Sequence, residues 1–282
     1  MELTFIGCLK GLALGLVQGL TEFLPVSSSG HLVLFKTILG YAPESGALNE
    51  ALLHLGTFFA ICLVFRRDVA DMIKGTIDFF AALFKKDGRD SVKINQAQKM
   101  VLMILITLVP LFIIAPFKDK IEELYNMPIV VGFALIVTGA VLFIADRLPK
   151  GDKDIYSATF FDALFIGLSQ AVAIIPGLSR SGTTISAGLF RRFDRRFAVR
   201  FSFLMSLPAV LGSVVLVVGD ALAEGITAVV LVPALIGMVS AFVSGVAAIR
   251  LVAWLIKKDR FGGFAYYCAL VGLAVVIVNM FR

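Results

Sequence analysis

The sequence predicts an all-α, polytopic membrane protein with an inverted-topology repeat and two re-entrant helix–loop–helix pairs. Of its 282 residues, 59% are hydrophobic and 16% are charged, and the mean hydropathy is +0.94. A soluble domain carries about 25% charged residues. The apolar runs are long and continuous, which favours helices over the alternating pattern of a membrane barrel. The third observation is a pair of polar, Pro/Gly-broken patches within the apolar sequence.

The two polar patches are Glu22–His31 and Pro176–Thr184. The apolar runs beside them are too short to span a bilayer comfortably. Broken helices at membrane depth occur only where they are buried in protein or line a wet cavity. A matched pair of them therefore indicates a binding site. The alternative, that both patches are ordinary extramembrane loops, leaves several spans too short.

Residues 1–150 are expected to form the first repeat, with a re-entrant pair near 3–40 and an amphipathic helix near 69–84. This amphipathic helix has an apolar side with Asp and Lys opposite, which is typical of a helix at the membrane interface. The predicted helices are Leu3–Leu24, Leu32–Leu39, Leu48–Phe65, Val69–Phe84, Met100–Phe117 and Ile129–Ala145, and Lys85–Lys99 is a charged loop.

Residues 151–282 are expected to form the second repeat, with a re-entrant pair near 158–191. Its predicted helices are Phe160–Ile175, Ile185–Phe190, Phe197–Val218, Ala228–Ile256 and Phe264–Phe281. A constant offset aligns two segments of the first repeat with two of the second. The aligned pairs are Gly15–Gln18 with Gly167–Gln170, and Ser27–Gly30 with Ser179–Gly182. Chance similarity between apolar segments is the alternative explanation.

The positions of Lys and Arg predict the orientation. The basic connections are Arg66–Lys99, Arg147–Lys153, Arg191–Arg200 and Lys257–Arg260, and the positive-inside rule assigns them to the cytoplasm. The first re-entrant pair then enters from the outer face and the second from the cytoplasm. The net charge of +6 fits anionic membrane lipids. No basic stretch alternates with aromatic residues, so we expect no nucleic-acid partner.

Several patch residues can carry chemistry. Glu22 lies late in an apolar helix, where a carboxylate costs a few kcal/mol, and Gln18 lies one turn earlier on the same face. Arg180 needs an anionic partner at membrane depth, and its planar guanidinium suits phosphate oxygens. Pairing between Glu22 and Arg180 alone is the purely structural interpretation. His31 is a candidate proton donor or phosphate ligand, whereas His54 is expected to be a helix-packing residue.

Both patches also place hydroxyl groups before a short helix. A serine at such a position ordinarily caps the helix, which accounts for one serine in each patch but not for the rest. Helix N-termini present N–H groups to anions, and glycine lets the backbone approach a ligand closely. The candidate phosphate-binding residues are Gln18, Ser27, Ser29, Gly30, Ser179, Ser181, Gly182, Thr183 and Thr184.

The segments Gln18–His31 and Pro176–Thr184 resemble the two signatures of the undecaprenyl-diphosphate phosphatases of the bacitracin-resistance type. The resemblance implies a bacterial plasma (inner) membrane enzyme that converts undecaprenyl diphosphate to undecaprenyl phosphate, the lipid carrier for peptidoglycan, and that confers bacitracin resistance. It also implies catalytic roles for Glu22, for Ser28 as nucleophile, for His31 as acid–base and for Arg180 as phosphate clamp.

The resemblance leaves some questions open. Family members are described as helped by Mg²⁺ or Ca²⁺, but Gln18 stands where other members carry Glu, so the metal ligands stay unknown. Glu22 either activates Ser28 or activates water directly. The rival function is a carrier that flips a polyprenyl phosphate, because broken helices in inverted repeats are common among transporters. A homodimer is also left open, since the small residues Gly237, Ser240, Ser244 and Ala248 suit a close helix contact.

Overall fold

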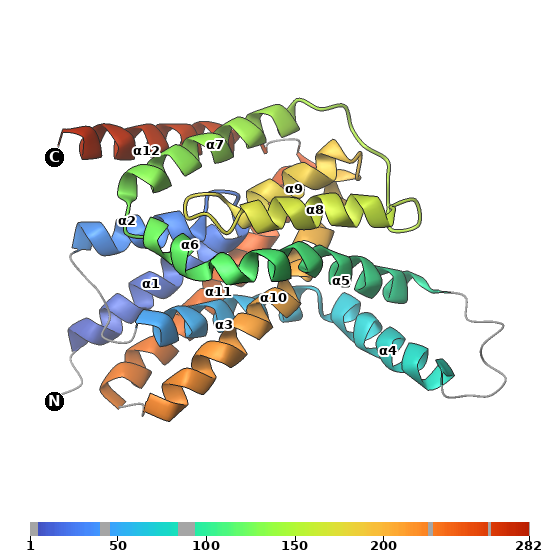
Figure 1. Ribbon diagram of the computed structural model, residues 1–282, viewed down its shortest axis with the longest axis horizontal. Helices are drawn as coiled ribbons and strands as arrows, with labels where there is room; N and C mark the ends of the chain where they lie inside the picture. The colour runs from blue at the N-terminus through green and yellow to red at the C-terminus, as the bar shows by residue number, and fades with distance from the viewer. Residues whose placement is uncertain (1–4, 40–45, 84–93, 225–227, 259–260, 282) are drawn as a thin grey trace.

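The computed structural model describes residues 5–39, 46–83, 94–224, 228–258 and 261–281. All regular structure in these ranges is helical, as Figure 1 shows. The helices are α1 (Phe5–Phe23), α2 (Ser28–Leu39), α3 (Gly46–Val64), α4 (Arg66–Leu83), α5 (Gln96–Ile114), α6 (Lys118–Leu124), α7 (Pro128–Asp146), α8 (Phe160–Val172), α9 (Arg180–Phe190), α10 (Arg195–Glu224), α11 (Ala228–Lys257) and α12 (Gly263–Met280), with a 3-10 helix at Ala115–Phe117.

Seven of these helices are long and apolar enough to cross a membrane: α1, α3, α5, α7, α10, α11 and α12. Helices α2, α8 and α9 have 12, 13 and 11 residues, and a spanning helix needs about 20. The predicted all-α, polytopic membrane fold is therefore confirmed, and the chain is a multi-pass membrane protein.

The predicted helix boundaries differ from the structure at the serine patches, at the start of α5 and at the end of α10, which extends to Glu224 instead of Val218. Helix α2 begins at Ser28 instead of Leu32, and α9 begins at Arg180 instead of Ile185. The hydroxyl-rich residues therefore form the first turn of each short helix, because the serine before it caps the helix. Helix α6 was not predicted. Most of the predicted charged loop Lys85–Lys99 lies outside the described residues, and α5 already begins at Gln96.

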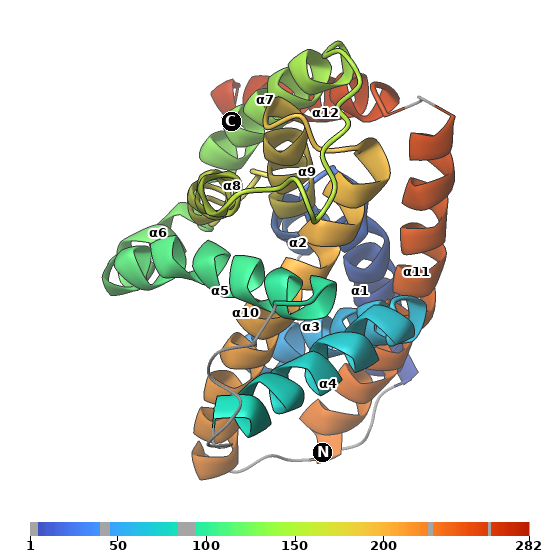
Figure 2. The same cartoon turned by 90° about the vertical axis from the view of Figure 1, so that its right-hand side faces the viewer.

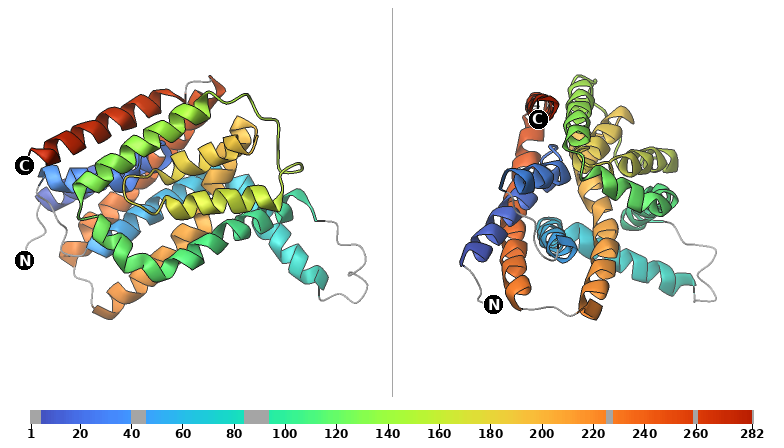
Figure 3. Two further views of the ribbon diagram at one scale, coloured as in Figure 1. Left: turned by 45° about the horizontal axis from the view of Figure 1, so that its top comes forward. Right: turned by 60° about the vertical axis from the view of Figure 1, so that its left-hand side comes forward.

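The two short helix pairs approach each other from opposite ends of the molecule. In Figure 1, α1 and α2 extend to the left of their connecting turn, and α8 and α9 extend to the right of theirs. Both turns lie in the middle of the bundle. Helices α7 and α12 run side by side along one edge, as Figures 2 and 3 show from other directions.

Small residues allow α1 to pack closely against α11. A Cβ atom added to Gly15 would lie 2.7 Å from Cβ of Ser240, and the backbone of Gly237 is also in the way. The Ser240 hydroxyl donates to the Leu12 carbonyl at 2.9 Å, and the Ser244 hydroxyl donates to the Gly15 carbonyl at 3.3 Å. The predicted small-residue contact thus forms within one chain, so this face of α11 is not free to pair two copies.

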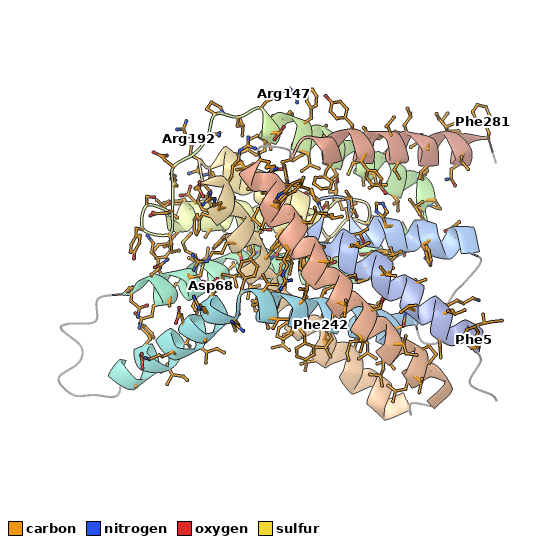
Figure 4. All side chains as sticks on the ribbon, turned by 180° about the vertical axis from the view of Figure 1, so that it is seen from behind. Phe5, Asp68, Arg147, Arg192, Phe242 and Phe281 are labelled. Atoms are coloured by element: carbon orange, nitrogen blue, oxygen red, sulfur yellow. The ribbon has the colours of Figure 1, made fainter. Side chains whose placement is uncertain are left out.

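Charged residues gather at the end of the molecule opposite to the described chain termini. Figure 4 shows Asp68 and Arg192 at one end and Phe5 and Phe281 at the other. Two arginines of the Arg191–Arg196 segment form ion pairs, whereas Arg192 and Arg196 are exposed. Arg191 Nε donates at 2.6 Å to Asp162, a fully buried residue in the first turn of α8. This ion pair joins the start of α8 to the end of α9. The predicted basic connection Lys257–Arg260 is only partly within the described residues.

Candidate functional site

The turn between α1 and α2 is built around Ser27. This residue has a φ of 70°, which is rare for a residue with a side chain. Its hydroxyl caps α2 by accepting from the Gly30 N–H at 3.2 Å, and its carbonyl accepts from the His31 N–H at 3.1 Å. The left-handed residue reverses the chain, so Ser28 at the start of α2 faces back toward Glu22 at the end of α1.

The turn between α8 and α9 likewise has a serine cap and a residue with positive φ. Ser179 caps α9 by accepting from the Gly182 N–H at 3.0 Å. Gly177 has a φ of +94°, and a Cβ atom there would lie 2.5 Å from the Val131 carbonyl oxygen, so the position requires glycine. Thr138 of α7 braces this turn, because its hydroxyl donates to the Gly177 carbonyl at 3.2 Å and accepts from the Ser179 N–H at 3.1 Å.

The two turns contact each other directly. The Ser27 hydroxyl lies 3.4 Å from the carbonyl oxygen of Leu178, and the Ser181 hydroxyl donates to the Leu24 carbonyl at 3.3 Å. A Cβ atom on Gly30 would lie 3.2 Å from Cα of Gly177. Each turn thus supplies a hydrogen-bond donor to the other, and the two helix N-termini are held next to each other.

Glu22 lies at the centre of the polar groups that meet here, and its side chain is only 4% exposed. One carboxylate oxygen pairs with the Arg180 guanidinium. The other accepts from the Ser28 hydroxyl at 2.5 Å and from the Gln18 amide at 3.1 Å. The predicted proximity of Glu22 and Arg180 is therefore confirmed. A buried carboxylate needs such partners, because an unpaired charge in a low-dielectric interior is very costly.

His54 is a member of this cluster that the sequence reasoning missed. Its Nδ1 accepts from the Gln18 amide at 3.1 Å and lies 3.7 Å from Glu22, and its side chain is 34% exposed. The expectation that His54 is a helix-packing residue stays a prediction, but its position beside Gln18 and Glu22 was not foreseen. A single histidine in an apolar run gives no sequence signal of a site, because the packing of α3 against α11 brings it there.

His31 is oriented away from Glu22. Its Nδ1 lies 2.8 Å from the Ser27 carbonyl oxygen, and its Nε2 lies 2.7 Å from the hydroxyl of Tyr267 on α12. Both ring nitrogens therefore have partners other than the carboxylate. The predicted acid–base role of His31 stays a prediction, and the structure instead brings His54 to Glu22.

The other predicted phosphate-binding residues fall into two groups. The hydroxyls of Ser27, Ser179, Ser181 and Thr184 are buried and hold the turns and helices together. Thr184, for example, lies 2.6 Å from the Ser202 hydroxyl of α10. By contrast, Ser28, Ser29, Arg180 and Thr183 are partly exposed. These partly exposed side chains are the ones that a ligand can reach, and the phosphate-binding roles of both groups stay predictions.

The donor set does not fit a resident metal ion. Among the residues that the structure describes, no three His, Cys, Asp or Glu side chains gather at one place. Glu22 and His54 are the two such side chains that meet at this site, Glu22 is already paired with Arg180, and the Gln18 amide oxygen is one further buried oxygen donor. Mg²⁺ and Ca²⁺ prefer several oxygen ligands. Any divalent cation here would have to take most of its ligands from substrate oxygens.

The arrangement is chemically suited to phosphoryl transfer. A serine hydroxyl hydrogen-bonded to a carboxylate is the pairing of a nucleophile with its base. Arg180 and two helix N-termini supply positive potential beside it, which favours a phosphate group. The site therefore brings together groups that can serve as nucleophile, base and anion binder within one set of contacts.

Comparison with known proteins agrees with this chemistry. The family model described as "Bacitracin resistance protein BacA" matches residues 11–274. A protein of Alkaliphilus metalliredigens named undecaprenyl-diphosphatase is 40% identical over 96% of this chain and 98% of its own length. Proteins with the same name from Halothermothrix orenii and Methanobrevibacter smithii are 38% and 37% identical over 95% of this chain, covering 97% and 96% of their own lengths.

Proposed function

Since the chain belongs to the bacitracin resistance protein BacA family, we propose that it is an integral membrane phosphatase that hydrolyses undecaprenyl diphosphate. The products are undecaprenyl phosphate and inorganic phosphate, so the enzyme recycles the lipid carrier for cell-wall synthesis and confers bacitracin resistance. The observation that carries the proposal is the Ser28 hydroxyl, which donates to Glu22 at 2.5 Å beside the guanidinium of Arg180.

The proposed reaction begins with Ser28. Its oxygen attacks the terminal phosphorus, the bond from that phosphorus to the bridging oxygen breaks, and undecaprenyl phosphate leaves. The hydroxyl proton passes to Glu22. Arg180 and the N-termini of α2 and α9 bind the phosphoryl oxygens and stabilise their charge in the transition state. Glu22 gives the Ser28 proton to the departing undecaprenyl phosphate and is ionised again. Water then attacks the phosphoserine phosphorus while Glu22 takes a proton from it, the bond from phosphorus to the Ser28 oxygen breaks, and the proton returns to Ser28 as inorganic phosphate leaves.

The alternative route, in which Glu22 activates water directly, is separated by a Ser28→Ala variant. The covalent route predicts that this variant loses phosphate release and that wild-type enzyme quenched in acid carries phosphate on Ser28, detected by mass spectrometry. Ser213→Ala, a substitution of an exposed serine on α10, is the matched control. Near-normal turnover by Ser28→Ala would exclude the covalent route.

We also propose that α1–α2 and α8–α9 are re-entrant pairs that enter from opposite faces of the membrane, within an inverted repeat of residues 1–150 and 151–282. Three observations support this: the lengths of α2, α8 and α9, the opposite directions of the pairs (Figure 1), and the matching caps at Ser27 and Ser179. The packing also corresponds, since Gly167 brings α8 against α5 as Gly15 brings α1 against α11.

The basic end of the molecule is assigned to the cytoplasm by the positive-inside rule. The first pair then opens to the outer face of a bacterial plasma membrane, and the diphosphate head group reaches the site from there. Cysteine labelling tests this orientation. A cysteine at Asn126, which is exposed between α6 and α7 at the opposite end, should react with a membrane-impermeant maleimide added to intact cells. One at exposed Asp152 should react only after the cells are opened.

An assay in detergent, where no transport is possible, distinguishes the proposed phosphatase from a carrier. Purified protein should release inorganic phosphate from undecaprenyl diphosphate. Binding of the lipid without phosphate release would favour the carrier.

The same assay with a chelator, followed by Mg²⁺ or Ca²⁺, tests whether a divalent cation held by the substrate contributes to phosphate release. A homodimer stays a prediction, and it would have to use a face other than the α1-facing side of α11.

A further inference from the structure

We propose that Tyr267 of α12 is a positioning residue that acts through His31 to hold Ser28 in line with Glu22. The proposal rests on the phosphatase function proposed above and extends it to a side chain outside both polar patches. Tyr267 lies 236 positions after His31 in the sequence. It reaches the turn between α1 and α2 because α12 packs against it, and the neighbouring Cys268 Sγ lies 3.5 Å from the Pro25 carbonyl oxygen.

The contacts of His31 indicate which ring nitrogen carries the proton when the imidazole is neutral. A carbonyl oxygen can only accept a hydrogen bond, so the Nδ1 that lies 2.8 Å from the Ser27 oxygen carries the proton. In the neutral ring, Nε2 is then an acceptor, and the Tyr267 hydroxyl donates to it at 2.7 Å. The two rings are also stacked, with centroids 5.6 Å apart and planes 10° apart. The Ser27 carbonyl thus sets the tautomer of the neutral ring, and Tyr267 holds the ring in its orientation.

His31 in turn holds the backbone of Ser27. The φ of 70° at Ser27 is a strained conformation that the surroundings must enforce. The Ser27 carbonyl accepts from the His31 N–H at 3.1 Å and from Nδ1 at 2.8 Å. Ser28 is the next residue, and its hydroxyl meets Glu22 at 2.5 Å. The contacts therefore run from Tyr267 through His31 and Ser27 to the nucleophile.

The first test compares Tyr267→Phe with Tyr266→Phe. Tyr266 is 59% exposed and meets the ring of Phe143, so it is a matched control on the same helix. Loss of one hydrogen bond predicts a kcat about 3- to 10-fold lower for Tyr267→Phe, with KM unchanged and the control unaffected. A raised KM with unchanged kcat would mean that Tyr267 binds substrate, and an unchanged kcat and KM would mean that it does nothing. Either result overturns the proposal.

The second test is a double-mutant cycle with His31→Asn. The asparagine amide can still donate to the Ser27 carbonyl, because its nitrogen occupies the place of Nδ1, but it cannot reach Tyr267. If Tyr267 acts through His31, adding Tyr267→Phe to His31→Asn should change kcat less than about twofold. If Tyr267→Phe lowers kcat in the His31→Asn background by as much as it does in the wild-type enzyme, the proposal is overturned.

The third test needs no turnover. The chain has only two histidines, so ¹⁵N-histidine labelling gives signals from two imidazole rings, each with an Nδ1 and an Nε2, and a His54→Gln variant assigns them to their rings. Tyr267→Phe should shift Nε2 of His31 alone, and Tyr266→Phe should shift neither ring. An unmoved His31 signal would overturn the proposal. Because this signal is independent of activity, a wild-type protein that releases no phosphate would refute the phosphatase function without deciding the role of Tyr267.

Discussion

Replacement of Glu22 by glutamine removes one negative charge from the centre of the site and changes little else in shape. The carboxylate accepts from Ser28 at 2.5 Å and from Gln18 at 3.1 Å, and it pairs with Arg180. Glutamine can still hydrogen-bond to these neighbours. It cannot take the proton of the Ser28 hydroxyl at neutral pH, so the variant isolates the role of Glu22 as a base.

The expected loss is large and falls on kcat. A positioned general base contributes about 10²- to 10⁴-fold, which corresponds to about 3 to 5 kcal/mol of transition-state stabilisation. Substrate binding should not weaken. Arg180 loses its internal anionic partner while its side chain stays 25% exposed, so it is more available to phosphate oxygens. KM should therefore stay the same or fall.

The assay is phosphate release from undecaprenyl diphosphate by purified protein in detergent, with thermal unfolding measured on the same preparations. Glu22→Asp is the matched control, because it keeps the charge and draws the carboxylate back by one methylene. It should retain more activity than Glu22→Gln. If Glu22→Gln folds normally and keeps more than about a tenth of wild-type kcat, Glu22 is not the base, and the proposed reaction is wrong.

Three further predictions follow from the contacts. Arg180→Lys keeps the charge but loses the planar fork, so phosphate-release kinetics should show kcat/KM lower by about 10- to 100-fold; an equal value would exclude Arg180 as the phosphate clamp. His54→Leu removes a polar neighbour of the buried carboxylate and should lower kcat about tenfold, and unchanged kinetics would confine His54 to packing. Gly15→Ala places a methyl group against Gly237 and should cost about 1–3 kcal/mol of stability, seen as a lower unfolding temperature. Gly212→Ala, where nothing lies within 4 Å, is its control, and equal unfolding temperatures for the two variants would contradict the close packing.

The parts of the fold that the sequence predicts are those set by local composition. Long apolar runs indicate the spanning helices, and Pro25 and Pro176 mark where two helices break. The pairing of Glu22 with Arg180 was also predictable, because two membrane-buried charges of opposite sign need each other. The helix starts were placed several residues late, since hydropathy does not recognise the caps at Ser27 and Ser179.

The parts that could not be predicted depend on packing between distant helices. His54, Thr138 and Tyr267 each lie in an apolar run, and nothing nearby in the sequence connects them with the polar patches. They reach the site because α3, α7 and α12 pack around the two turns. Ser181 is the opposite case, a residue that the sequence places in a candidate site. Its hydroxyl-rich patch suggests a ligand contact, but its hydroxyl donates to the Leu24 carbonyl.

The ion pair between Arg180 and Glu22 has a consequence for the order of events on the enzyme. Before a substrate arrives, each of these groups satisfies the other. In the proposed reaction, an entering diphosphate must compete with the carboxylate for the guanidinium, and its binding leaves Glu22 without this cation just when a proton acceptor is required. After the last phosphate departs, the pair closes again. The ion pair thus neutralises both groups between turnovers of the proposed reaction, and free inorganic phosphate would have to displace an internal anion before it could inhibit the next turnover.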